Sequence, residues 1–224
     1  MASRRAKNPK PTKKTSKKLS PLDRQLLELA DSCKLVEPEA EVAEARRLID
    51  AGANVNCRMD NDIGRTPLIR VCHAFYPKMT ALFLDRGADV NLRSGDGEET
   101  PLTIAANHVE RTEIVELLLD HRAEIDAPGR FRMTALHWAV GSDYLAVAKL
   151  LVERGAPVNA VDINGDPPLV SAATTGNLKM VRLLVEAGAD VNLNGSSGLS
   201  ALQAAVNSKD GKVVRYLEGK GAKA

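Results

Sequence analysis

Apolar side chains along most of this chain follow the spacing of short helices. Ile114, Val115 and the leucines at 117–119, for example, recur at helical intervals, which predicts a helix through these residues. A shorter stretch before it, Leu102 to Asn107, contains Ala105 and Ala106, whose small side chains allow close approach of helices. The pattern therefore predicts pairs of short helices joined by turns.

Two markers show that this helix pair is repeated. Gly-Ala occurs at residues 52, 87, 155, 188 and 221, with Arg122-Ala123 in the one gap, so successive offsets are 35, 35, 33, 33 and 33. Thr-Pro-Leu or a variant begins at residues 66, 100, 134, 167 and 200, at offsets of 34, 34, 33 and 33. Two markers in register over the same intervals predict an array of about six repeats.

Each marker suits one position in a helix pair. The hydroxyl of Thr-Pro-Leu can accept a free N–H at a helix start, and proline fits the first turn because it has no N–H. Glycine after the second helix supplies a left-handed C-cap, and Asp-Val-Asn then leads into a polar turn such as residues 94–97. One such unit cannot bury its own apolar face, so neighbouring units must stack.

With Thr-Pro-Leu, Ala-Ala, Leu-Leu and Gly-Ala-Asp-Val-Asn at a 33-residue pitch, the chain resembles the ankyrin-repeat family over about residues 22–224. The resemblance implies an all-α solenoid of stacked helix-turn-helix repeats with β-turn fingers, whose inner helices and fingers form a concave binding surface. We expect this domain to span residues 21–224. Its first repeat lacks Thr-Pro-Leu and its last has a polar second helix, so these two are expected to act as caps.

Charge separates the first twenty residues from the rest. They hold eight basic side chains and no acid, which leaves the remainder with 23 basic and 29 acidic residues. Residues 1–20 thus carry +8, residues 21–224 carry −6, and we predict that residues 1–20 form a disordered basic tail. The side chains expected to act electrostatically there are Arg4, Arg5, Lys13, Lys14, Lys17 and Lys18.

Composition narrows the class of protein further. No apolar stretch approaches the roughly 20 residues of a membrane-spanning helix, and no apolar segment follows the basic N-terminus as in a secretory signal. Three cysteines without a Cys-x-x-Cys motif favour a reducing compartment. The expected location is the cytoplasm, with the nucleus as the alternative if the tail directs import.

Motifs for catalysis are missing from the sequence. No glycine-rich phosphate loop is present, and the four histidines lack metal-ligand spacing among themselves or with cysteine. For His137, in Thr-Ala-Leu-His, the resemblance to ankyrin repeats implies structural hydrogen bonds between repeats. We therefore expect no enzymatic activity, no metal and no cofactor.

Aromatic residues are few but concentrated. Six of the seven lie between residues 75 and 144, and all but Phe83, which occupies a core position, lie where a partner could contact them. Aromatic residues beside arginine are typical of binding hot spots. The alternative is that they fill gaps between irregular repeats. The expected partner-binding residues are Arg70, His73, Phe75, Tyr76, Arg93, His108, Arg130, Phe131, Arg132, Trp138 and Tyr144.

The sequence thus predicts a monomeric, non-enzymatic module that binds a partner protein through the concave face and fingers of repeats 2–4, as an inhibitor or adaptor. The alternative function is nucleic-acid association or nuclear targeting through the basic tail. The acidic remainder of the chain would repel phosphates, so nucleic acid is expected to contact only the tail.

Overall fold

The computed structural model describes residues 19–32, 39–58, 64–94, 98–108, 110–195 and 198–223. These residues form twelve α-helices and one turn of 3-10 helix, and none of them forms a strand. The helices are α1 (Pro21–Asp31), α2 (Glu39–Asp50), α3 (Pro67–Ala74), α4 (Pro77–Asp85), α5 (Pro101–His108), α6 (Glu113–Asp120), η1 (Arg130–Arg132), α7 (Ala135–Gly141), α8 (Leu145–Glu153), α9 (Pro168–Thr174), α10 (Leu178–Glu186), α11 (Ala201–Asn207) and α12 (Gly211–Gly219).

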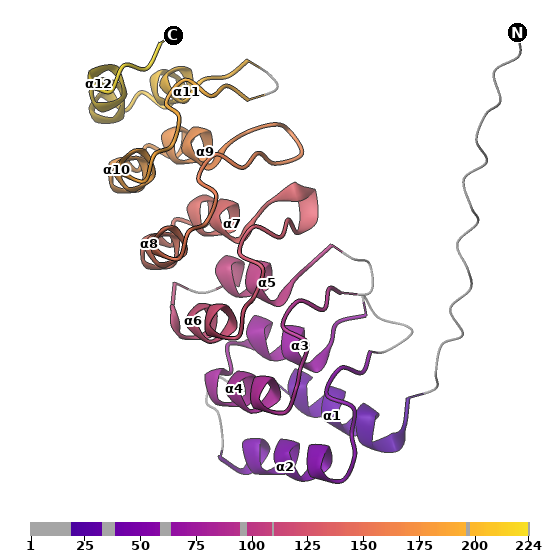
Figure 1. Cartoon of the computed structure of the whole chain (residues 1–224). Helices are drawn as coiled ribbons and strands as arrows, with labels where there is room; N and C mark the ends of the chain where they lie inside the picture. The colour runs from indigo at the N-terminus through magenta and orange to yellow at the C-terminus, as the bar shows by residue number, and fades with distance from the viewer. Residues whose placement is uncertain are drawn as a thin grey trace, which may run out of the picture.

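The helices stand in two parallel rows (Figure 1). Odd-numbered helices pack against one another from α1 to α11 and form the inner row, beside which the connecting fingers project. Even-numbered helices form the outer row, and each packs on its inner partner. The predicted all-α repeat solenoid is confirmed, with six helix pairs in the described residues. The predicted tail lies outside the described residues except for Leu19 and Ser20.

Hydroxyl side chains begin the inner helices as the sequence predicts. Thr66 Oγ1 accepts the Ile69 N–H at 3.3 Å at the start of α3, and Ser200 Oγ accepts the Gln203 N–H at 3.1 Å at the start of α11. The first repeat uses the same device through Ser20, whose Oγ accepts the Asp23 N–H at 3.1 Å. Ser-Pro-Leu at residues 20–22 is therefore a further variant of the repeat marker, and it extends the folded domain to Ser20.

Small side chains allow the inner helices to stack. Ala106, Ala139, Ala172 and Ala205 recur every 33 residues and are all fully buried. Cys72 takes the same place in α3 and is 1% exposed. A larger side chain there would push neighbouring inner helices apart, so this position fixes their separation.

Asparagine side chains join consecutive fingers. Asn159 Nδ2 donates to the Gly188 carbonyl at 3.3 Å, and its Oδ1 accepts the Asp190 N–H at 2.9 Å. Three other asparagines form the same two bonds with the following repeat: Asn56, Asn91 and Asn192. We call this pair of bonds the asparagine clamp.

The junction between repeats 3 and 4 cannot form this clamp. By sequence register, Asp126 takes the asparagine position and has no side-chain N–H to donate to Gly155, while Pro157 has no backbone N–H. Outer helices α6 and α8 also pack together more sparsely than any other neighbouring pair in the outer row. Repeats 3 and 4 are therefore the most loosely joined neighbours along the outer row of the described array, although their inner helices α5 and α7 pack closely.

His137 links repeats 4 and 5, as expected for a structural histidine. Its Nδ1 accepts the Thr134 N–H at 3.2 Å, so the proton of the neutral ring is on Nε2, which donates to the Asp166 carbonyl at 3.3 Å. Burial of the ring lowers the pKa of His137, because the charged form loses solvation. The neutral ring is the form that makes both contacts.

Candidate functional site

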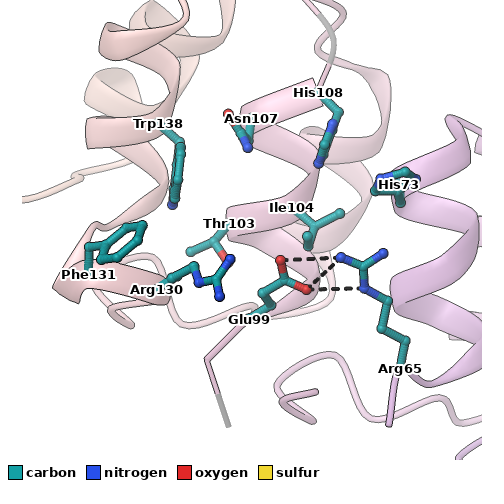
Figure 2. A pocket seen from close by; sticks show the side chains of 10 residues that line it. All are labelled: Arg65, His73, Glu99, Thr103, Ile104, Asn107, His108, Arg130, Phe131 and Trp138. Atoms are coloured by element: carbon teal, nitrogen blue, oxygen red, sulfur yellow. Dashed lines mark hydrogen bonds and ion pairs between the residues drawn. The ribbon is translucent and has the colours of Figure 1, made fainter. Parts of the chain in front are cut away.

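A pocket of about 210 Å³ opens on the inner row of repeats 2–4 (Figure 2). Three inner helices, α3, α5 and α7, and the fingers that precede them supply its walls. The lining residues are Arg65, His73, Glu99, Thr103, Ile104, Asn107, His108, Arg130, Phe131 and Trp138.

Phe131 forms one rim of the pocket. Its side chain is 54% exposed, although it belongs to η1 and its carbonyl accepts the Ile163 N–H of the next finger at 2.7 Å. Phe131 and Arg132 both have positive φ, 56° and 57°, a conformation that costs a residue with a side chain about 1–2 kcal/mol. The finger thus exposes a large apolar ring to solvent. Its backbone has an unfavourable φ at two residues and is held by the hydrogen bond to the next finger.

Arginine and glutamate pairs line the finger side of the pocket. The Arg130 guanidinium lies over the Phe131 ring at 5.4 Å, and its Nε contacts Glu98 Oε2 at 2.9 Å. Arg65, from the preceding finger, donates three hydrogen bonds of 3.0–3.3 Å to Glu99. Both glutamates are therefore neutralised by arginines within the site.

Two histidines from successive helices meet at the far side of the pocket. His73 lies in the last turn of α3, and His108 is the last residue of α5. Their ring centroids are 4.3 Å apart. Burial lowers the pKa of each ring. The neighbouring His73 ring lowers the pKa of His108 further, Arg65 lowers the pKa of both rings, and Glu99 opposes these shifts. Both rings are consequently neutral near pH 7.

Trp138 lies across the pocket on α7, half-buried and packed against the core. Figure 2 shows its indole nitrogen pointing into the space between the helices, toward Thr103 and Arg130. Thr103 Oγ1 bonds to Thr100, and Asn107 Oδ1 accepts from Ser142 Oγ at 3.2 Å. The Trp138 N–H has no acceptor among the described residues.

The structure brings together five of the eleven residues predicted from the sequence: His73, His108, Arg130, Phe131 and Trp138. Four others lie outside the pocket. Phe75 is half-buried beneath the Arg111 guanidinium at 5.0 Å, Tyr144 is half-buried before α8, Arg93 is half-buried in a finger, and Arg132 is exposed.

The prediction that Tyr76 and Arg70 lie on the surface and contact a partner is wrong. Tyr76 is 2% exposed and packs in the core, because the left-handed backbone at Phe75 turns the chain inward before α4. Arg70 is 7% exposed, forms an ion pair with Asp31, and donates from Nε to the Arg65 carbonyl at 3.2 Å. Arg70 thereby joins repeats 1 and 2, and both residues are buried away from a partner.

The sequence analysis did not identify five of the lining residues: Arg65, Glu99, Thr103, Ile104 and Asn107. Arg65 and Glu99 directly precede the threonines of two successive Thr-Pro-Leu markers, so their offset of 34 residues places them side by side. Reading charged residues at equal repeat positions would have found this pair.

Within the described ranges, no group of three or more His, Cys, Asp or Glu side chains is arranged to hold a metal ion. None of the described helices is long and apolar enough to cross a membrane.

Two rows of short helices with projecting fingers define a helical repeat solenoid, a class of protein with an extended binding surface. A family model described as "Ankyrin repeats (3 copies)" matches residues 76–162 and 136–224. The chain belongs to the ankyrin-repeat family.

Curated relatives resemble parts of the chain. Human SH3 and multiple ankyrin repeat domains protein 2 is 36% identical over 104 residues, 46% of this chain and 6% of that protein. Human ankyrin repeat and SOCS box protein 6 is 36% identical over 40% of this chain, and mouse neurogenic locus notch homolog protein 1 is 30% identical over 56%. The chain spans only 5–23% of the length of these three relatives.

Proposed function

We propose that this protein holds a partner protein on the inner-row face of repeats 2–4, with the pocket as the centre of the contact. The observation that carries the proposal is the exposed Phe131 ring beside Trp138 and Arg130 around one cavity. Tryptophan and arginine are enriched in interface hot spots, and a large exposed aromatic ring stabilises a complex when a partner removes it from water.

The size of the site also favours a protein partner. A pocket of about 210 Å³ is smaller than the roughly 300–1,000 Å³ of sites for whole small molecules, so it suits one side chain of a larger ligand. The remaining contact would spread over the inner helices and fingers, to about 800 Å² on each partner. By holding a partner there, the protein would act as an inhibitor or an adaptor.

Affinity capture with the full chain from cells that express it tests the proposal. Phe131→Ala and Trp138→Ala should each reduce recovery of the partner at least tenfold, whereas Val206→Ala, which changes a side chain 56% exposed on α11, should not. Circular dichroism confirms that each variant is folded. Full recovery with both pocket variants would place the binding site elsewhere on the array.

A further inference from the structure

Some polar groups of the pocket are paired within the described part of the protein, and others, including the exposed His73 and His108, are not. Its carboxylate Glu99 is held by Arg65, and neighbouring Glu98 is held by Arg130. Among the described residues, no hydrogen-bond acceptor faces the ring nitrogens of His73 or His108, or the indole N–H of Trp138. Each neutral imidazole carries one N–H. The other nitrogen of each ring is an acceptor, so the open positions include three N–H donors, one on each imidazole and one on the indole.

These donors lie at opposite sides of the pocket. Figure 2 shows the two imidazoles beside α3 and α5 and the indole beside α7, with the α5 side chains between them. A ligand that satisfies all of them must supply acceptors at separate points. An extended peptide does this, because its backbone carbonyls repeat along the chain and its side chains add further acceptors.

Charge favours an anionic ligand at the histidine end. The helices α3, α5 and α7 contain no Asp or Glu, whereas their outer partners α4, α6 and α8 contain five. The charged groups that act on both rings are Arg65 and Glu99, which already cancel each other. The inner helices thus bring no acidic side chain to the pocket, and the finger residues Glu98 and Glu99 that lie beside it are paired with arginines.

We propose that the pocket receives an acidic linear segment of the partner protein, whose Asp or Glu carboxylate accepts hydrogen bonds from ring N–H groups at the edges of His73 and His108 while a backbone carbonyl accepts the Trp138 N–H. The inference rests on the proposed protein-binding function and specifies the chemistry of its ligand. A carboxylate beside the two rings favours their protonated form, since an imidazolium donates stronger, charge-assisted hydrogen bonds. Binding therefore tightens as the pH falls toward 6, where a glutamate side chain is still ionised.

Trp138 is the one tryptophan of the chain, so its fluorescence reports on this pocket alone. The test titrates the full chain with a blocked hexaglutamate peptide at pH 7.5 and pH 6.0, and with a hexaglutamine peptide of the same length. Hexaglutamate should change the fluorescence saturably, with at least tenfold higher affinity than hexaglutamine and about fivefold higher affinity at pH 6.0 than at pH 7.5.

The variant His73→Asn/His108→Asn should weaken hexaglutamate binding about tenfold and remove its pH dependence. His121→Asn, which changes an exposed histidine on the outer side, is the matched control and should leave both unchanged. Attraction of the peptide to the basic N-terminal residues is the same in all variants and does not depend on these rings.

Equal responses to the two peptides, or a pH dependence that survives the double substitution, would overturn the proposal. An equal, histidine-dependent response to a single-stranded DNA hexanucleotide would replace the acidic peptide by a phosphate ligand. If Phe131 and Trp138 are needed for partner capture but the two histidines are not, the protein-binding function stands and only the acidic segment is rejected.

Discussion

The asparagine clamp between fingers yields a prediction with a matched control in the same chain. Asn159→Ala removes two hydrogen bonds between repeats 4 and 5, one from Nδ2 to the Gly188 carbonyl and one from the Asp190 N–H to Oδ1. Asp126→Ala changes the corresponding position at the junction of repeats 3 and 4, where the clamp is missing. Both variants introduce alanine at the same position of the repeat, but only Asn159→Ala removes the two hydrogen bonds.

The magnitude follows from the number of bonds. A hydrogen bond contributes about 0.5–1.5 kcal/mol net, and both of these are solvent-exposed, so Asn159→Ala should lower the free energy of unfolding by about 1–2 kcal/mol. At about 2–4 °C per kcal/mol for a domain of this size, the melting temperature should fall by about 2–8 °C. Asp126→Ala should change the free energy by less than about 0.5 kcal/mol, as is usual for an exposed side chain without such contacts.

Urea unfolding followed by far-ultraviolet circular dichroism measures both values in one series. Asp126→Asn extends the test, because it supplies a donor to the Gly155 carbonyl while Pro157 still offers no N–H. One of the two bonds is restored, so a gain of about 0.5–1 kcal/mol is expected. If Asp126→Ala costs as much as Asn159→Ala, the clamp does not explain the coupling of these repeats.

Three further predictions concern single residues and the tail. Arg122→Gly should stabilise the fold by about 0.5–1 kcal/mol in thermal unfolding, because Arg122 holds a φ of 65° where the other repeats have glycine; a loss of stability would contradict this reading. His137 has a pKa below that of an unfolded histidine, so the unfolded chain binds more protons below about pH 6.5. The free energy of unfolding should therefore decrease as the pH is lowered below this value, by up to about 1.4 kcal/mol per pH unit. In pH-dependent unfolding, His137→Gln should make this decrease smaller. Deleting residues 1–18 should abolish DNA retention at low salt in an electrophoretic mobility assay, and unchanged retention would exclude the tail as the contact.

Repeat periodicity predicted the elements well because it is a local property of the chain. Thr66 and Ser200 begin helices as their hydroxyls predict, and the alanine at every thirty-third position lies buried between inner helices. One variant of the marker, Ser20-Pro21-Leu22, was missed because an insertion separates the helices of the first repeat from the regular register.

The site was predicted only in part because exposure is not local. Tyr76 and Phe131 both interrupt the repeat pattern, yet Tyr76 is 2% exposed and Phe131 is 54% exposed. Each follows or occupies a position of positive φ, and the direction in which that turn sends the side chain depends on the neighbouring repeat. Aromatic composition alone therefore could not separate gap-filling residues from surface residues.

The sequence by itself determined the repeat, its helices and the charge difference between the first twenty residues and the rest, because caps, breaks and helical spacing act over a few residues. The tertiary structure decided which side chains share a pocket. His73 and His108 are 35 residues apart, and Arg65 and Glu99 are 34 apart. Stacking of one repeat on the next brings these side chains into contact, since equal positions in successive repeats become neighbours in space.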